Sequence, residues 1–159
     1  MNKNFVIIEK LTKNFINDKF VVKVLKNLSL KIETGKIIAL VGPSGSGKST
    51  LLHLLALLDK PTEGKISLFG EVTQNISEEK KNQLIRNNIS IIFQNNNLLS
   101  DFTAVENVAM PLIIRNMGYD DSVKAAEGFL KKVNLGHRLN HLPSDLSGGE
   151  QQRVAIARN

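Results

Sequence analysis

A glycine-rich run in the first third of the chain has the residue types and spacing that bind phosphate. It satisfies the pattern G-x-x-x-x-G-K-[ST] with Gly42, Pro43, Ser44, Gly45, Ser46, Gly47, Lys48, Ser49 and Thr50. Glycines let backbone N–H groups turn toward phosphate oxygens, and the helix that follows points its positive end at the same place. In this pattern Lys48 reaches the β- and γ-phosphates, and Ser49 offers its hydroxyl to Mg²⁺. The run predicts a nucleoside triphosphate site.

The flanking sequence distinguishes this run from a flexible linker. Residues 36–41 are continuously apolar and mostly β-branched after the first, which is typical of a strand buried on both faces of a parallel sheet. Residues 49–59 are rich in leucine and reach Pro61 without a helix breaker, so we expect a helix that begins near Lys48. Because kinases, GTPases, helicases and transporters share such a loop, the run identifies a ligand and leaves the activity open.

A second run, residues 146–158, also combines a hydroxyl, glycines and a helix start. Ser147, Gly148, Gly149 and Glu150 precede an amphipathic stretch. Backbone N–H groups at such a helix N-terminus attract anions. Taken alone, the run also fits an ordinary glycine turn before a helix, and it gains weight from the phosphate loop upstream.

The rest of the chain has the pattern of short strands followed by helices. We expect strands over residues 4–9, 23–32, 65–69 and 89–93, and helices over residues 77–86, 105–114 and 121–133. A strand, a glycine loop and a helix, followed by further strands and helices, indicate an α/β layer architecture with a helical insertion.

Composition narrows the class of protein. The 159 residues contain no cysteine, which excludes a disulfide scaffold and a catalytic thiol and favours a reducing compartment. No apolar run approaches the roughly 18 residues of a membrane-spanning helix, and the N-terminal one is too short for a signal peptide. Lys and Arg number 21 against 15 Asp and Glu, which favours anionic partners. The lysines are scattered, so we expect no nucleic-acid partner.

Together, the two glycine runs resemble the phosphate loop and the signature motif of ATP-binding cassette (ABC) transporter ATPases. Residues 91–94, Ile-Ile-Phe-Gln, resemble the strand before the family's Q-loop and identify Gln94 as the glutamine near Mg²⁺ and the attacking water. Residues 11–15 resemble the segment whose aromatic residue stacks on adenine, with Phe15 in place of the usual tyrosine. Phe20 is the competing candidate for that aromatic residue.

The resemblance implies the fold class, an α/β P-loop NTPase of the ABC ATPase type. Such a domain has a RecA-like parallel sheet core, an antiparallel β subdomain and a helical subdomain. Residues 1–159 then form one ATP-binding domain. Its β subdomain and phosphate-loop core cover about 1–94, and its helical subdomain and signature helix cover about 95–159, with the C-terminal part of the core missing.

The resemblance also implies ATP and Mg²⁺ as cofactors and assigns roles to single residues. The phosphate loop, residues 42–50, and Phe15 bind the nucleotide. Lys48 and Gln94 are the catalytic candidates, and Ser49 and Gln94 lie toward the metal.

The implied partners are a second copy of the chain and integral membrane subunits. In a head-to-tail dimer, the nucleotide of one copy is contacted by four residues of the other, Ser147, Gly148, Gly149 and Glu150. The membrane subunits are contacted through the region Gln94–Phe102. This arrangement places the chain peripherally on the cytoplasmic face of the bacterial inner membrane.

Within the family, residues 101–111, 135–139 and 150–153 are most similar to the lipoprotein-releasing (Lol) type of ATPase subunit. This similarity predicts a translocase subunit that couples ATP hydrolysis to release of lipoproteins from the inner membrane. The cell-division and macrolide-export types share nearly the same motifs and stay as alternatives.

Three residues of the family have no counterpart in this sequence: the aspartate that helps hold Mg²⁺, the general-base glutamate beside it, and the switch histidine. All three follow the signature motif in the family, whereas His53, His137 and His141 precede it. Asn159 also departs from the small apolar residue that the family has there. We therefore expect a truncated ABC ATPase that does not turn over ATP at a normal transporter rate, or a non-hydrolysing nucleotide-binding fragment. Residues 36–41 would then lack their neighbouring strands.

Overall fold

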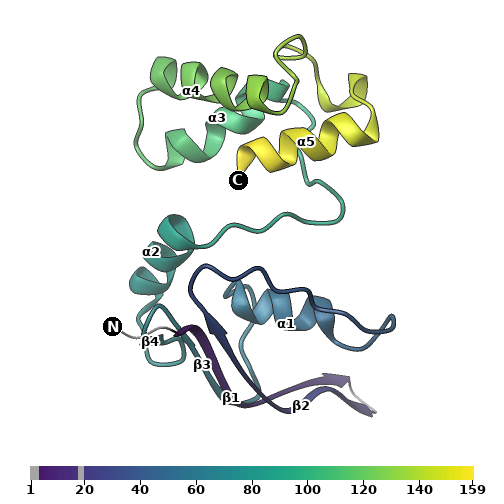
Figure 1. The fold of residues 1–159 in the computed structure, drawn as a ribbon, viewed down its shortest axis with the longest axis vertical. Coiled ribbons are helices and arrows are strands. Elements are labelled where there is room, and N and C mark those ends of the chain that lie inside the picture. Colours follow the sequence, from purple (N-terminus) through teal and green to yellow (C-terminus); the bar gives the residue numbers. More distant parts are fainter. Residues whose placement is uncertain (1–3, 18–19) are drawn as a thin grey trace. The chain divides into compact units, whose positions relative to one another are not determined.

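The computed structural model describes residues 4–17 and 20–159 of the chain (Figure 1). The chain forms two compact units, Met1–Ile89 and Ser90–Asn159. Each unit has a hydrophobic core of its own, so each is described by itself. The boundary expected near residue 94 concerns the subdomains of a complete ATP-binding domain and stays a prediction.

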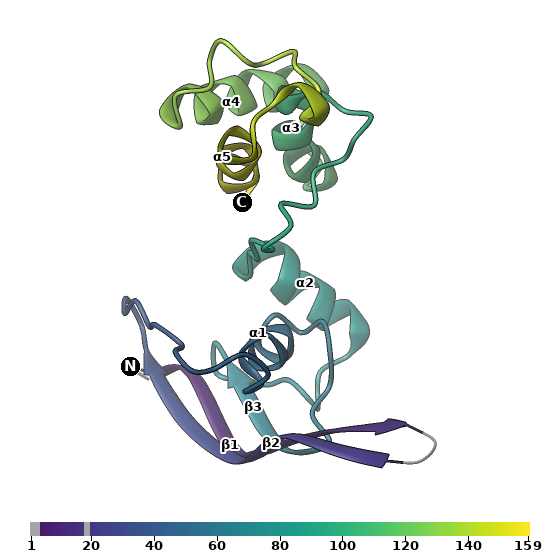
Figure 2. The same ribbon diagram turned by 90° about the vertical axis from the view of Figure 1, so that its right-hand side faces the viewer.

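The first unit contains a four-stranded antiparallel sheet with the strand order β2-β1-β3-β4. Figure 2 shows β1, β2 and β3 of this sheet. The strands are β1 (Asn4–Asn17), β2 (Phe20–Glu33), β3 (Glu63–Leu68) and β4 (Glu71–Val72). Successive side chains of β1 lie on opposite faces of the sheet, so Val6 and Ile8 are buried on the same face. A register shift between Ile8 and Leu11 brings Leu11 into the same buried cluster.

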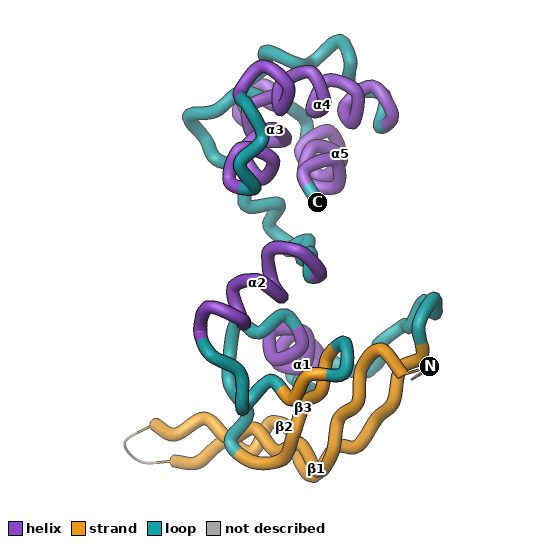
Figure 3. Tube along the Cα trace, turned by 90° about the vertical axis from the view of Figure 1, so that its left-hand side faces the viewer, coloured by secondary structure: helices purple, strands orange, loops and turns teal. Residues whose placement is uncertain are grey.

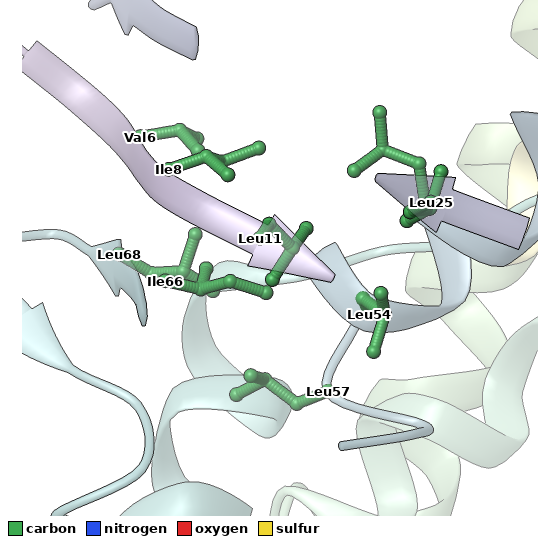
Figure 4. Close-up of a cluster of buried hydrophobic side chains, with 9 residues drawn as sticks. Val6, Ile8, Leu11, Leu25, Leu54, Leu57, Ile66 and Leu68 are labelled. Atoms are coloured by element: carbon green, nitrogen blue, oxygen red, sulfur yellow. The ribbon is translucent and has the colours of Figure 1, made fainter. Parts of the chain in front are cut away.

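One helix packs against this face of the sheet. α1 (Lys48–Leu55) contributes Leu51 and Leu54, and the turn after it contributes Leu57. Figure 4 shows this core, whose members are Val6, Ile8, Leu11, Leu25, Leu51, Leu54, Leu57, Ile66 and Leu68. α2 (Glu78–Asn88) adds only partly buried side chains to this core. The core therefore fixes α1, and with it the end of the phosphate loop, on the sheet.

The second unit is built from helices. They are α3 (Ala104–Ile114), α4 (Tyr119–Lys132), a short 3₁₀ helix η1 (Pro143–Asp145) and α5 (Gly148–Arg158). Ala126 and Leu130 are four residues apart on α4 and share its buried face, where they join Val108 of α3 and Val154 of α5 in one core. Among the described residues, no helix has both the length and the apolar composition needed to cross a membrane.

The expectation of a buried strand at residues 36–41 is wrong. This stretch is irregular chain between β2 and α1, and Figure 3 draws it as loop. Ile37 is fully exposed and Val41 is 86% exposed. A central strand needs hydrogen-bond partners along both edges, and none of the strands in the described ranges pairs with this stretch. An apolar, β-branched composition favours a strand, but the strand forms only where another strand pairs with it.

Other expected elements differ in detail. The strand expected over residues 89–93 is irregular chain. The helix expected to reach Asp59 ends at Leu55, and Leu57 beyond it has a left-handed backbone with φ of 58°. β1 and β2 pair well beyond the ranges expected for them. The helices expected over residues 77–86, 105–114 and 121–133 are confirmed to within two residues at each end.

Candidate phosphate-binding site

The phosphate loop, residues 42–50, leads from the irregular segment into the first turn of α1. Gly45 and Gly47 have φ angles of 78° and 88°, which residues with a Cβ rarely adopt. At Gly47 a Cβ would also lie 2.9 Å from side-chain atoms of Val24 and Leu25 on β2. Glycine is therefore required at residue 47 both by the backbone conformation and by the packing of β2.

The N-terminus of α1 has no side-chain cap. Its N-cap residue is Gly47, and the first turn contains no acidic residue. The first N–H groups of a helix have no acceptor inside it, and they lie at the positive end of the helix dipole. An uncapped N-terminus of this kind favours a bound anion.

Lys48 folds back over the loop that precedes it. Its Nζ donates hydrogen bonds to the carbonyl oxygens of Pro43 and Gly42 at 2.6 Å and 2.8 Å. The hydroxyl of Ser46 is 3.5 Å from the same nitrogen. The ammonium group is thus held at the loop, next to the N-terminus of α1, where phosphate oxygens would compete for it. Ser49 lies in the same turn with its side chain exposed.

An open hollow of about 570 Å³ lies between the phosphate loop and β2. Its lining includes Lys23 and Lys26 of β2 and Lys48 of α1. Three lysines in the lining of one hollow favour a ligand with several negative charges. Apolar side chains line the rest, among them Val24, Leu25, Leu28, Leu40 and Val41. The hollow has the size of a small-molecule site.

Phe15, the candidate for adenine stacking, lies on β1 opposite Val22 of β2 and is 45% exposed. The Nζ of Lys13 lies 5.0 Å from the centroid of its ring, at a cation–π distance. The same ammonium donates to Asp59 Oδ1 at 2.7 Å, and this hydrogen bond lowers the pKa of the Asp59 carboxyl below its ordinary value. Phe20 is exposed as well, so the choice between the two aromatic residues stays open.

In the second unit, Ser147 and Glu150 form a capping box at the start of α5. The Ser147 hydroxyl accepts from the Glu150 N–H at 3.3 Å and donates to Glu150 Oε2 at 2.8 Å. The Ser147 N–H donates to the same carboxylate oxygen at 2.9 Å, and Arg138 Nε donates to Glu150 Oε1 at 3.0 Å. The hydrogen bonds from Ser147, followed by Arg138, lower the pKa of Glu150 to about 2.

Gly148 and Gly149 follow Ser147 in the signature run, and both have open space where a Cβ would stand. At Gly148 no atom lies within 4 Å of that position, and at Gly149 only an Arg153 nitrogen lies at 4.0 Å. Neither glycine has a left-handed φ. Because neither packing nor backbone conformation demands glycine here, the space is free for a group from another molecule.

Gln94 belongs to the second unit, in irregular chain, and its side chain is exposed. Arg158 at the end of α5 donates to the carbonyl oxygens of Asn97 and Asn96 at 2.8 Å and 3.0 Å, which ties α5 to the chain after Gln94. The structure thus groups residues 42–50 in the first unit and residues 147–150 in the second. It describes Gln94 only within the second unit.

Two residues that make contacts near these sites, Lys13 and Arg138, have no role predicted from the sequence. Lys13 reaches Asp59 across 46 residues, and Arg138 reaches Glu150 across 12. No local pattern marks pairs at such separations. The Ser147 cap does have a local signal, because Ser-x-x-Glu before an amphipathic run is the capping-box pattern.

Comparisons with known proteins agree with the two glycine runs. The family model described as ABC transporter matches residues 25–159. The lipoprotein-releasing system ATP-binding protein LolD of Rickettsia bellii is 43% identical, over 100% of this chain and 70% of the relative. LolD of Legionella pneumophila (strain Paris) is 48% identical, over 99% of this chain and 70% of the relative. Among solved structures, the ATP-binding cassette MJ0796, a dimer in a post-hydrolysis state bound to ADP and Pi, matches with a TM-score of 0.89 and 39% identity, over 96% of this chain and 68% of that chain.

The chain belongs to the ABC transporter family, as an ATP-binding subunit. The resemblance drawn from the phosphate loop and the signature run is thereby confirmed, and the match to MJ0796 confirms the fold class of an ABC-type P-loop ATPase. The chain spans about 70% of the length of these LolD relatives. Membership in this family implies ATP as the ligand.

Proposed function

We propose that the chain is the ATP-binding subunit of a lipoprotein-releasing transporter, where ATP binding and hydrolysis drive the release of lipoproteins from the inner membrane. The observation that carries this proposal is the identity of 43% and 48% to two LolD proteins along nearly the whole chain. The uncapped N-terminus of α1 supports it, since this is where such a subunit needs to hold a triphosphate.

The phosphates bind at the N-terminus of α1. N–H groups of the loop and of the first helical turn donate to the phosphate oxygens, and Lys48 exchanges the carbonyls of Gly42 and Pro43 for the β- and γ-phosphates. Such charge-assisted hydrogen bonds are stronger than those to carbonyl groups, so the exchange favours the bound state. Phe15, or Phe20 in its place, stacks on the adenine ring.

Ser49 would offer its hydroxyl to Mg²⁺, and Gln94 is the other candidate ligand. Both offer neutral oxygen atoms, which suits a metal bound mainly by phosphates and water. When bound, the metal neutralises charge on the phosphates and polarises the γ-phosphoryl group. The exposed side chains of Ser49 and Gln94 support this assignment.

A second copy of the chain completes the site. Ser147, Gly148, Gly149 and Glu150 of that copy contact the γ-phosphate in trans, and the open space at the two glycines supports this approach. Arg138 offsets the negative charge of Glu150 at the helix terminus that meets the phosphate. The dimeric state in which MJ0796 was solved supports the same arrangement.

The region Gln94–Phe102 contacts the integral membrane subunits. The chain then lies peripherally on the cytoplasmic face of the bacterial inner membrane. Closure of the dimer on ATP and its reopening are passed to the membrane subunits through this region.

A second candidate is nucleotide binding without turnover. It is favoured by the unpaired segment at residues 36–41, because the phosphate loop that follows is not anchored to a strand of a sheet. The subunit of a cell-division or macrolide-type system is a further member of the same class and shares the same phosphate loop.

The test is reconstitution of the chain with the inner-membrane subunits of a lipoprotein-releasing system in vesicles that carry a lipoprotein. The proposed function requires ATP-dependent release of the lipoprotein, and the substitution Lys48→Ala should abolish that release. The control Lys65→Ala removes an exposed lysine of β3 and leaves release unchanged. ATP binding without turnover or release would favour the second candidate, and absence of ATP binding would overturn both. If the chain supported transport only with the membrane subunits of a macrolide-type or cell-division system, it would be assigned to that system.

A further inference from the structure

Asn107 of α3 is a polar side chain that is completely buried, with 0% exposure. Its carboxamide bonds only to backbone groups just before the helix. Oδ1 accepts from the N–H of Leu99 at 2.8 Å. Nδ2 lies within donating distance of three carbonyl oxygens, those of Phe102 at 2.8 Å, Thr103 at 3.0 Å and Leu99 at 3.1 Å. One amide group thus makes polar contacts with four backbone atoms of residues 99–103.

The same loop is fixed from its other side. Phe102 N–H donates to the Leu99 carbonyl at 3.3 Å, which closes a turn. Thr103 starts α3 with a capping box, in which its N–H and its hydroxyl donate to Glu106 Oε2 at 2.8 Å and 2.7 Å. A loop held by a buried amide and by a capping box has little freedom to change shape.

Burial of this amide is costly unless every polar atom finds a partner. Packing of α3 alone would be served by leucine, which has the same branching and needs no hydrogen bonds. The arrangement therefore serves the conformation of the loop. That loop presents Leu99 and Phe102 to solvent, with exposures of 42% and 38%. Asp101 between them is the only charged residue from position 94 to 103.

We propose that Asn107 is a positioning residue that holds the loop of residues 98–102 in the shape that binds the membrane subunit. The surface consists of Leu99 and Phe102 with Asp101 between them, so the partner is an amphipathic cytoplasmic segment that presents apolar side chains and a basic residue. This inference rests on the proposed function, which assigns Gln94–Phe102 to the membrane subunit. Because the loop is held in advance, binding costs little conformational entropy.

The test begins with Asn107→Asp in the full chain. At neutral pH the introduced carboxylate faces three carbonyl oxygens and has no hydrogen to donate to them. The carboxylate can still accept from the Leu99 N–H, but its repulsion of the three carbonyl oxygens should open the loop. We therefore expect the amide of Leu99 to exchange with solvent about tenfold faster, and affinity for the detergent-solubilised inner-membrane subunits to fall about tenfold, while ATP affinity is unchanged. The matched control is Asn140→Asp, the same chemical change on an exposed side chain of the second unit.

The pH profile separates positioning from general damage. Once protonated, the introduced carboxyl group can again donate to one carbonyl, so lowering the pH from about 7 to about 5 restores part of the protection of Leu99. Glu106 stays ionised in this range because its hydrogen bonds with Thr103 lower its pKa. His141 lies beside the start of α3, where its carbonyl accepts from the Ala104 N–H, so wild type is measured alongside. Loss of Leu99 protection that does not change with pH overturns the positioning role.

Because Asn107→Asp can unfold α3, Phe102→Ser is measured as a second variant. It keeps the carbonyl that Asn107 binds, so we expect wild-type amide exchange and weaker binding to the membrane subunits. Wild-type binding by either variant overturns the inference. If the unsubstituted chain does not bind the membrane subunits although it binds ATP, the proposed membrane contact fails, and the inferred docking role falls with it. Leu99 exchange in Asn107→Asp then still shows whether Asn107 holds the loop.

Discussion

The N-termini of α1 and α5 both follow or contain glycines, yet they satisfy their first N–H groups differently. α1 begins at Gly47 with no side-chain cap and no acid in its first turn. α5 begins at Ser147 with a capping box, and Glu150 supplies a carboxylate that Arg138 also binds. One terminus is left open to an anion from outside, whereas the other already holds an anion of its own.

This difference distinguishes the roles of the two helix starts, although both have similar glycine-rich sequences. A glycine-rich helix start attracts anions in general, but Glu150 occupies part of that capacity at α5. We therefore expect α1 to bind phosphate within a single chain. Under the proposed function, α5 would contribute Gly148 and Gly149, where open space allows a close approach, once a second copy brings a nucleotide to it.

The largest expected effect comes from the core that holds α1 in place. Leu54→Ala removes a fully buried side chain between α1 and the sheet, so we expect it to lower the free energy of unfolding by about 2–5 kcal/mol. Leu52→Ala on the exposed side of the same helix is the control, with little effect. Chemical denaturation measures both, with amide exchange to locate the loss. Equal effects of the two variants would mean that this core does not support α1.

The next largest effect is the difference in stability when a methyl group is added at each of the two helix starts. Gly47→Ala forces a Cβ onto a left-handed residue and against Val24 and Leu25, so we expect a loss of about 1–2 kcal/mol or more. Gly148→Ala adds a methyl group in open space and is not expected to reduce stability. Thermal unfolding of both variants tests this contrast. A larger loss for Gly148→Ala would contradict it.

The capping box at α5 has a smaller effect. Ser147→Ala removes the hydroxyl that accepts from the Glu150 N–H, and we expect a loss of about 1 kcal/mol from the second unit. Ser144→Ala removes a hydroxyl that bonds only to the neighbouring Asp145 and serves as the control. Unfolding followed by amide exchange in α5 measures the difference. No loss for Ser147→Ala would show that Glu150 alone organises this terminus.

The smallest expected effect is on how the stability of the second unit depends on pH in acid. The pKa of Glu150 is lowered from 4.5 to about 2, so its carboxylate stabilises the fold above its ordinary pKa. That contribution is lost as the pH falls from about 4.5 toward 2. Glu150→Gln should therefore reduce the acid dependence of stability, measured by denaturation at stepped pH. An unchanged pH profile would mean that the Ser147 and Arg138 contacts do not favour the charged form.

The parts of the chain that sequence predicts well are those with local causes. The phosphate loop and the starts of α1 and α2 follow from Gly47, Ser77 and the residues beside them. The strand predicted at residues 36–41 rests on propensity, which is local, whereas pairing depends on distant chain, so that prediction is wrong. The same holds for Asn107, since nothing local shows that an asparagine in α3 binds the backbone eight residues earlier.

The most direct test is to titrate the isotopically labelled chain with Mg²⁺ and ATP and follow the backbone amides by NMR. We predict saturable shifts for Gly45, Gly47, Lys48 and Ser49, and binding at least about tenfold weaker in Lys48→Ala. At concentrations where the chain is monomeric, Gly148 and Gly149 should not shift. Shifts at the start of α5 without shifts at α1, or no saturable binding at α1, would contradict the account.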